Sequence, residues 1–500
     1  LAVHTILNRF DAMDLHDRGA SEQTRITGWR AAALLGPALF LPCLNMLHGQ
    51  TGIFEPIALF TDSRLATLTA VSNLIYLSWH AAGIVLILWA VREALAFPRH
   101  VSMATWGDIL RSVVQFLGDI LLVPLFVFFP AEKPVLGYLP TQQNRQLVAA
   151  CPSLHAFKQT SWFRNQWLSF AAVMWDDYRG ARFAKFVRRE CITAPDGGVL
   201  ALDWWEEPVE VPATKVLIIG ATFTGDGTVG AMRAACQYFS HRGWRCVAMV
   251  KRGTGRIIPN RQPESSSGKS KAQPWCLSGF EDVEMAIDHV AAAYPDLPLC
   301  GLGYSLGAAQ LRNYITRTGK RSKLEAVVLA DAGEDWEVCL YDIDKRVPLL
   351  GRALNLAASQ TLLRECHCVP HPRGKAEELA DAEEPPTLRG GMVEVVRDLM
   401  GPAHGFKPTQ QGARQYMRKC QPADPAGVSI PSLELFSFND TLIDVPMVRD
   451  LLQLYRASPH IITCGTRGGS HIVRWEGLYA QCWIARVGYD FLEATLALKH

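Results

Sequence analysis

The segment 303–307 reads Gly-Tyr-Ser-Leu-Gly and holds the serine with the clearest signature of a nucleophile. It lies between a strand-like run, 297–304, and a helix-like run, 306–318. A serine on a tight strand-to-helix turn projects its hydroxyl above the sheet, and glycines two positions to either side leave room for that turn. The pattern therefore predicts that Ser305 attacks a carbonyl carbon, provided that a base and a carboxylate follow it in the chain.

Two later residues stand where that carboxylate and that base are expected. Asp440 follows the alternating run 432–438, and His471 follows the apolar run 460–464. In such a triad the imidazole takes the serine proton, and the carboxylate orients the ring and stabilises the imidazolium. We therefore predict Ser305, Asp440 and His471 as the catalytic group, in the chain order serine, acid, histidine.

The acid and the base each have an alternative interpretation. The Asn-Asp-Thr sequence at 439–441 is typical of turns, so Asp440 could serve only to cap one. Asp444 and Asp331, the latter after another strand-like run, are rival carboxylates. His471 is one of 14 histidines and could be a loop residue without a role, but its glycine-rich approach favours the functional interpretation.

A tetrahedral oxyanion also needs two backbone N–H donors. One is expected to be the amide of Leu306, directly after the serine, and the other should come from the loop after the early strand-like run 215–220. Ala221 and Thr222 are the candidates for this second donor, and the sequence does not choose between them. Chemistry of this kind requires neither a metal ion nor an organic cofactor.

From about residue 151 to about residue 498 the chain resembles a membrane-anchored subfamily of α/β-hydrolase-domain (ABHD) proteins. That subfamily includes medium-chain phospholipases, fungal medium-chain fatty-acid ester synthases and plant embryogenesis-associated relatives. The resemblance rests on landmarks that occur in the same order: Thr-Ser-Trp-Phe-Arg-Asn at 160–165, Asp-Gly-Gly at 196–198, Leu-Asp-Trp at 202–204, Arg-Gly at 252–253, Tyr-Pro at 294–295, the serine segment, Asp440, and His471 with Glu-Gly at 476–477.

The sequence departs from the subfamily pattern at three places. Ile-Ile-Gly at 218–220 replaces a Leu-Pro-Gly strand end, Lys251 stands where asparagine is usual, and a serine separates the Gly-Gly pair from His471. These departures concern the oxyanion loop and loop shapes rather than the triad. The resemblance implies an α/β-hydrolase fold, with a mostly parallel central sheet flanked by helices and an inserted lid. It also implies lipid esters, either phospholipids or medium-chain acyl esters, as substrates.

The alternation of strand-like and helix-like runs sets the expected organisation of the second part of the chain. We predict a catalytic domain over 191–500, preceded by a linker and opening segment over 136–190. The alternation lapses at about 352–430, where acidic and Pro-Pro stretches precede helical patterns at 391–400 and 412–418. This position is typical of a lid over a hydrolase site.

The first part of the chain has the composition of a membrane region. After an N-terminal segment, 1–30, the region 31–135 contains three candidate spans at 31–54, 65–91 and 112–131. The second span runs 27 residues without Asp, Glu, Lys or Arg, which is long enough to cross a bilayer. We expect two or three transmembrane helices and an integral membrane protein. The arginines flanking the spans do not agree on one orientation, so the side of the catalytic domain stays open.

Overall composition limits the remaining function classes. A net charge of +2 gives no reason to expect nucleic acid as a partner. The 13 cysteines are odd in number and unevenly spaced, which does not indicate a disulfide framework. The Cys-His-Cys at 366–368 with His371 lacks the spacing of a standard zinc site.

The expected activity is therefore that of a membrane-anchored serine hydrolase acting on lipid or medium-chain acyl esters. Two alternatives use the same residues differently. The acyl group could pass from Ser305 to an alcohol instead of water, which would make the protein an acyltransferase. The fold could also serve as a membrane scaffold without turnover, although an intact triad argues against that role.

Overall fold

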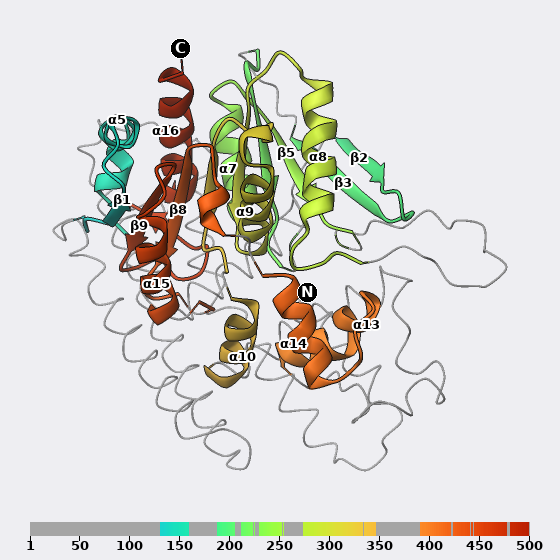
Figure 1. The fold of residues 1–500 in the computed structure, drawn as a ribbon. Helices are drawn as coiled ribbons and strands as arrows, with labels where there is room; N and C mark the ends of the chain where they lie inside the picture. The colour runs from blue at the N-terminus through green and yellow to red at the C-terminus, as the bar shows by residue number, and fades with distance from the viewer. Residues whose placement is uncertain are drawn as a thin grey trace, which may run out of the picture. The chain divides into compact units, whose positions relative to one another are not determined.

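The computed structural model (Figure 1) describes residues 131–159, 188–205, 212–223, 225, 230–252, 254, 274–333, 335–346, 391–421, 424–440, 442–443, 445–477 and 481–499. Nearly all of them belong to one compact unit of the chain, made of 128–159, 179–476 and 481–500. The candidate spans (apart from residue 131), the segment 160–165, the cysteine–histidine cluster at 366–371, the start of the predicted lid at 352–390, and Asp444 lie outside the described residues. Among the helices that are described, none is long and apolar enough to cross a bilayer.

A large sheet organises the described part of the chain. Its order is β1-β9-β8-β7-β6-β4-β5-β3-β2, and all neighbours from β5 to β9 in that order are parallel. The edge strands β1 and β2, and the β3–β5 pair, are antiparallel. The strand bounds are Val135–Tyr138 for β1, Arg188–Thr193 for β2, Val199–Trp205 for β3, Lys215–Gly220 for β4, Trp244–Val250 for β5, Leu299–Tyr304 for β6, Val327–Ala330 for β7, Ser432–Ser437 for β8 and Ile461–Thr466 for β9, with a separate pair β10 (Trp475–Glu476) and β11 (Gln481–Cys482).

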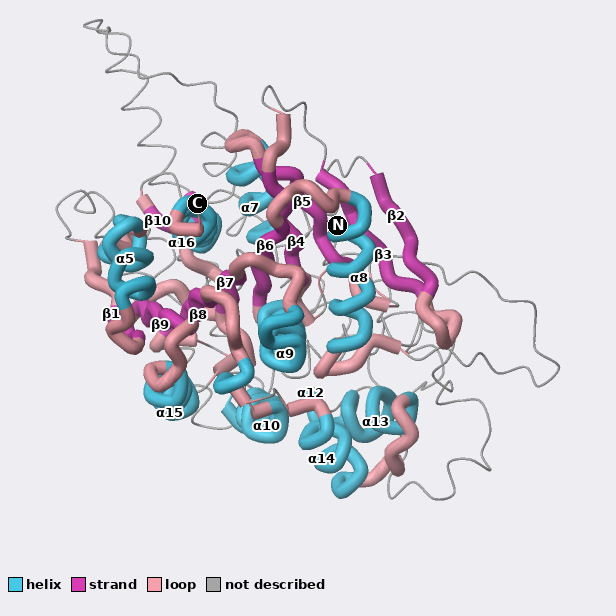
Figure 2. Tube along the Cα trace, turned by 45° about the horizontal axis from the view of Figure 1, so that its top comes forward, coloured by secondary structure: helices cyan, strands magenta, loops and turns pink. Residues whose placement is uncertain are grey.

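Helices cover both faces of this sheet (Figure 2). The helices α8 and α9 pack together on one face, and α7 and α16 pack together on the other. The helix bounds are Gln142–Ala150 for α5, Gly230–Ser240 for α7, Phe280–Ala293 for α8, Leu306–Thr318 for α9, Trp336–Arg346 for α10, Met392–Val395 for α12, Gly401–Ala403 for α13, Gln410–Lys419 for α14, Val445–Tyr455 for α15 and Trp483–Ala497 for α16. A π-helical turn spans Val396–Met400, and 3-10 turns span Pro152–His155, Gly319–Arg321 and Pro425–Gly427.

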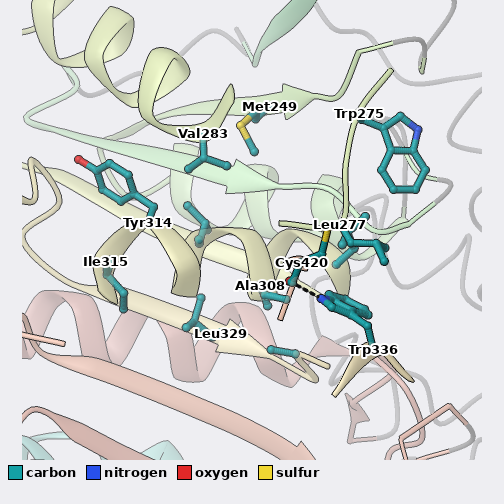
Figure 3. Packing of buried hydrophobic residues seen from close by; sticks show 14 of the residues in the cluster. Met249, Trp275, Leu277, Val283, Ala308, Tyr314, Ile315, Leu329, Trp336 and Cys420 are labelled. Atoms are coloured by element: carbon teal, nitrogen blue, oxygen red, sulfur yellow. Dashed lines mark hydrogen bonds between the residues drawn. The ribbon is translucent and has the colours of Figure 1, made fainter. Parts of the chain in front are cut away.

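The two helical layers follow from the period of two along the strands. Leu329 of β7 packs in a buried cluster with Ala308 and Ile315 of α9 (Figure 3). The preceding residue, Val328, faces the other layer, because a Cβ on Gly488 of α16 would lie 3.8 Å from it. Since successive side chains of a strand point to opposite faces, strands of continuous apolar sequence bury both faces and need helices on each. The arrangement confirms the expected α/β-hydrolase fold, with a mostly parallel central sheet flanked by helices.

The strand β1 extends this sheet beyond the expected boundary. It pairs with β9 through the register Val135 with Gly465 to Tyr138 with Ile462. The helix α5 that follows contacts α16. The sheet therefore draws on residues before position 191, within the segment expected to be a linker, because β9 offers an edge whose backbone groups need partners.

The described part of the predicted lid region is helical and packs against α10. The amides of Met392 and Val393 donate to the Asp344 carboxylate at 2.7 and 2.9 Å, so this acid caps α12. The Trp336 indole donates to the Cys420 carbonyl at 3.0 Å (Figure 3). Both helical patterns expected at 391–400 and 412–418 are confirmed by α12, the π-helical turn and α14.

A buried ion pair between α9 and β8 offers a test of this packing. The side chains of Arg312 and Glu434 are 0% and 1% exposed, and the guanidinium binds both carboxylate oxygens at 2.8 and 2.6 Å.

Replacing Glu434 by glutamine leaves a buried charge without its partner, so we expect a loss of about 3–5 kcal/mol in the free energy of unfolding. The double variant Arg312→Met, Glu434→Leu should lose far less, because it buries no charge. Chemical denaturation followed by tryptophan fluorescence measures both, and equal losses would contradict the interpretation.

Candidate active site

Ser305 lies on a strained turn between β6 and α9. Its backbone has φ 53° and ψ −119°, and its amide donates to the Ala330 carbonyl at 2.8 Å. A Cβ on Gly303 would lie 2.4 Å from the Ala308 Cα, and one on Gly307 would lie 2.3 Å from the Gly220 carbonyl carbon. Both contacts are too short for a side chain, so glycine is required at each position. The turn therefore has the geometry expected for a nucleophile elbow, and the serine stays partly exposed.

The structure brings the three predicted triad residues together. The His471 Nε2 lies 2.8 Å from the Ser305 hydroxyl oxygen, and its Nδ1 lies 2.9 Å from the Asp440 Oδ2. His471 is 9% exposed and Asp440 is 5% exposed. The imidazole thus bridges a partly exposed hydroxyl and a buried carboxylate, the arrangement in which it can carry a proton away from the serine.

The Asp440 carboxylate makes the turn contacts that its sequence suggests and also faces His471, because its two oxygens have different partners. The Oδ1 accepts from the amides of Leu442 and Ile443 at 2.7 and 2.9 Å, which closes a turn after β8. The Oδ2 faces the imidazole. The turn therefore holds the Asp440 carboxylate next to the His471 ring.

The rival carboxylate Asp331 serves a different partner. Its two oxygens accept from the Arg474 guanidinium at 2.8 and 2.7 Å, and its Oδ2 also accepts from the Ile472 amide at 2.7 Å. The side chains of Asp331 and Arg474 are 1% and 0% exposed. Both Asp331 oxygens are engaged by Arg474 and by the Ile472 amide, so this carboxyl contacts the backbone next to His471 and the guanidinium, whereas Asp440 contacts the ring.

The residues on either side of His471 have strained backbone conformations, and their amides are hydrogen-bonded to side chains. Ser470 has φ 52° and Ile472 has φ 55°, a region that a β-branched residue rarely adopts. The Ser470 amide donates to the Asn439 side-chain oxygen at 2.8 Å, and Asp331 accepts from the Ile472 amide. Such strain persists only where surrounding contacts fix the conformation. The two flanking hydrogen bonds therefore determine where the imidazole points.

The charges around His471 favour its protonated form. Burial of the ring works against a positive charge, but the charge of Asp440 and its hydrogen bond outweigh that effect and raise the pKa of His471 above the ordinary value. Asp331 also raises this pKa, and Arg474 opposes the rise. A raised pKa helps the ring to accept a proton, although the ring acts as a base only while it is still neutral.

The two expected sources of oxyanion donors lie side by side. Leu306 is the first residue of α9, where backbone amides lack acceptors within the helix. The loop after β4 passes against this turn, since a Cβ on Gly307 would lie 2.6 Å from the Ala221 carbonyl oxygen. Ala221 is buried and Thr222 is half-buried. The loop therefore lies beside the first turn of α9, and the geometry does not choose between Ala221 and Thr222 as the donor.

Ligand-type atoms of Asp331, Asp440 and His471 lie within 4.8 Å of one another, so they need to be considered as a metal site. Both Asp331 oxygens accept from Arg474, and those of Asp440 accept from two amides and face the imidazole. A cation would have to displace these donors and would sit beside a guanidinium. The donor set therefore fits a hydrogen-bonded relay better than a metal centre.

Three charged or polar residues contact this site without having been predicted to do so from the sequence. They are Asn439, Arg474 and Lys251. The sequence offers one weak signal for each: Asn439 directly precedes the triad acid, Arg474 is a charge within the apolar run after His471, and Lys251 replaces a usual asparagine. None of these signals identifies a partner, because the partners lie far away in the chain.

The pKa of His471 provides a test that does not depend on any activity. We expect its NMR titration midpoint to lie above about 6.5, the ordinary value for histidine. Asp440→Asn removes the largest favourable charge, so it should move the midpoint down by more than one pH unit. His404 serves as an internal control, because burial lowers its pKa and the substitution should leave that unchanged. A midpoint that Asp440→Asn does not move would contradict the assigned contact.

Comparison with known proteins relates this chain to others. No protein-family model matches the chain. Human phospholipase ABHD3 is 23% identical over 323 residues, which cover 63% of this chain and 73% of the relative. The embryogenesis-associated protein EMB8 of Picea glauca is 27% identical over 152 residues, covering 28% and 30% of the two chains. Among solved structures, a Pyrococcus furiosus esterase covers 61% of this chain and 90% of its own, at 13% identity and a TM-score of 0.37. The sequence relatives and the strand order together identify the chain as an α/β hydrolase of the ABHD3-like family, distantly related to proteins named phospholipase ABHD3 and EMB8.

Proposed function

We propose that this protein is a serine ester hydrolase in which Ser305, His471 and Asp440 form the catalytic triad. The observation that carries the proposal is the pair of contacts made by one imidazole, at 2.8 Å to the Ser305 hydroxyl and at 2.9 Å to the Asp440 carboxylate. The family supports an esterase or lipase type of activity, because its members include proteins named phospholipases.

The mechanism follows from where the atoms lie. As the Ser305 oxygen attacks the ester carbonyl, its proton passes to the His471 Nε2, and the carbonyl oxygen becomes an oxyanion. The amides of Leu306 and of Ala221 or Thr222 stabilise that charge. The imidazolium then gives its proton to the departing alcohol, which leaves an acyl-serine. Water attacks the acyl group, gives its proton to His471 and releases the acid, and the same proton returns to the serine.

We further propose that the substrate is a lipid or medium-chain acyl ester reached at a membrane. The support is the name of the relatives, phospholipase ABHD3, and the uncharged stretches of sequence before residue 131, which lie outside the described residues. An anchor of that kind would hold the site close to the interface in which such esters reside. The described helices 391–421 belong to the insertion that would cover the acyl chain.

Covalent labelling tests the proposal directly. We expect a fluorophosphonate probe to label the wild-type protein in membranes, and Ser305→Ala to abolish the labelling because the attacking oxygen is gone. Ser432→Ala is a matched control, since the hydroxyl of this buried serine on β8 donates to the Ile430 carbonyl, away from the triad. Absence of labelling in a folded wild-type protein would contradict an activated serine and would favour the scaffold alternative.

The pH dependence of labelling tests the role of the histidine. Because His471 works as a base only when neutral and its pKa is raised, the labelling rate should increase with pH through a midpoint above about 6.5. Asp440→Asn should slow turnover by about 10⁴-fold, as expected when the imidazole tautomer is wrong. A labelling rate that does not change with pH across that midpoint would argue against His471 as the base.

Product analysis separates hydrolysis from acyl transfer. The triad and the acyl-serine are the same in both, so only the acceptor differs. Incubation of an acyl ester with an added short alcohol should give mainly free acid if water is the acceptor. Mainly the new ester would favour the acyltransferase.

A further inference from the structure

Lys251 lies at the end of β5 with its ammonium group directed into the loop after β4. The residue is only 4% exposed. Its Nζ donates to the carbonyl oxygens of Thr222 and Gly225, at 3.1 Å for the second. Its own carbonyl accepts from the Thr254 amide at 3.1 Å and from the Thr254 hydroxyl at 2.8 Å. The lysine is therefore fixed at its backbone and reaches across to a neighbouring loop.

Burying an ammonium group costs free energy, so the contacts of Lys251 must compensate for the loss of water. A lysine taken out of water is stable only where hydrogen-bond acceptors replace its hydration shell. Here the loop supplies backbone carbonyls as those acceptors. The contact works in both directions, since the loop compensates the charge and the charge fixes the orientation of the peptide units that carry these carbonyls.

Other contacts hold the described residues of this loop. The Gly225 amide donates to the Thr222 carbonyl at 3.3 Å. Phe223 packs edge-to-face on Trp275 with ring centroids 4.9 Å apart, and the Lys251 ammonium lies 5.9 Å from the same Trp275 ring. Trp275 itself is buried beside Leu277 (Figure 3). This segment therefore contacts the Lys251 ammonium through Thr222 and the Trp275 ring through Phe223.

The same loop forms one side of the proposed oxyanion hole. It begins at Gly220, which meets the first turn of α9 at Gly307, and it continues through Ala221 and Thr222. In a trans peptide the N–H and the C=O point in opposite directions. A cation that holds the Thr222 carbonyl therefore fixes the direction of the Phe223 N–H directly. It acts on the candidate donor amides of Ala221 and Thr222 through the Thr222 backbone.

We propose that Lys251 is a positioning residue that holds the loop after β4, through Thr222 and Gly225, so that this loop presents the second oxyanion donor. This inference rests on the proposed function, and it assigns to the lysine a role through the loop rather than contact with the substrate.

The test compares Lys251→Met with wild type in kcat, KM and the inhibition constant of an alkyl boronic acid, whose adduct with serine places an oxygen in the oxyanion hole. Methionine keeps much of the volume and removes the charge. Loss of a whole oxyanion donor costs about 10²–10³ in kcat, so a displaced loop should lower kcat on the order of 10-fold to 100-fold. KM should stay within about 2-fold, because ground-state binding is unaffected. The boronic acid should bind more weakly by the same factor as kcat falls.

Lys215→Met is the matched control. This lysine is the first residue of β4, at the end of the strand away from the loop, and its ammonium pairs with Glu493 at 2.7 Å. We expect it to change thermal stability without changing kcat or boronate binding. If Lys251→Met does not fold, Lys251→Gln carries the same test, because glutamine keeps a donor for one carbonyl.

Each outcome decides between the proposals. A folded Lys251 variant with unchanged kcat and boronate binding overturns the positioning role. A variant whose KM alone rises overturns it too, because that result indicates a substrate contact. If neither Lys251 variant folds while Lys215→Met does, the lysine is required for the fold and the positioning role is rejected. A folded wild-type protein without ester turnover defeats the proposed function instead.

Discussion

The active site depends on one close approach, that of the first turn of α9 to the ends of β4 and β6. Gly303 meets Ala308 and Gly307 meets Gly220 at distances that exclude any side chain. This contact holds the Ser305 backbone at φ 53°, so that the hydroxyl leaves the sheet and the helix amides face the same space. The loop after β4 enters that space because it begins at Gly220. The proposed nucleophile and the candidate oxyanion donors are therefore positioned by a single packing constraint.

The histidine is held in a different way, by hydrogen bonds to a strained loop. Two residues with positive φ flank His471, and each costs on the order of 1–3 kcal/mol. The strain is offset by contacts with the ends of neighbouring strands, since Asn439 follows β8 and Asp331 follows β7. In a parallel sheet these strand ends share one edge, so residues distant in sequence reach the same loop. The position of His471, the proposed base, therefore depends on residues at this edge of the sheet.

The parts of this site that sequence predicts are those with a local signature. The serine turn needs glycines at fixed spacing, and the acid and the base follow in a fixed chain order, so Ser305, Asp440 and His471 could be named in advance. The central strands and α9 are also local patterns of apolar residues. Asp331 shows the limit, because nothing in its neighbourhood reveals that its partner is Arg474 rather than the histidine. The same holds for Lys251, whose acceptors are backbone carbonyls that have no sequence identity, and for β1, which joins an edge formed by residues far away in the chain.

The buried ion pair between Asp331 and Arg474 also has an electrostatic consequence for the proposed reaction. Its two charges cancel, which leaves the negative charge of Asp440 next to a neutral imidazole. When the imidazole takes the serine proton, that negative charge gains a positive neighbour at 2.9 Å, and the buried group becomes neutral overall. A buried cluster is less costly when neutral, so proton transfer relieves an imbalance that exists in the resting site. If Arg474 stood alone, its positive charge would oppose the imidazolium; if Asp331 stood alone, a second buried negative charge would have to be carried before the reaction begins. Pairing the two lets the charge of Asp440 dominate, so that Asp331 can lie close to His471 without competing with Asp440 in the proposed triad.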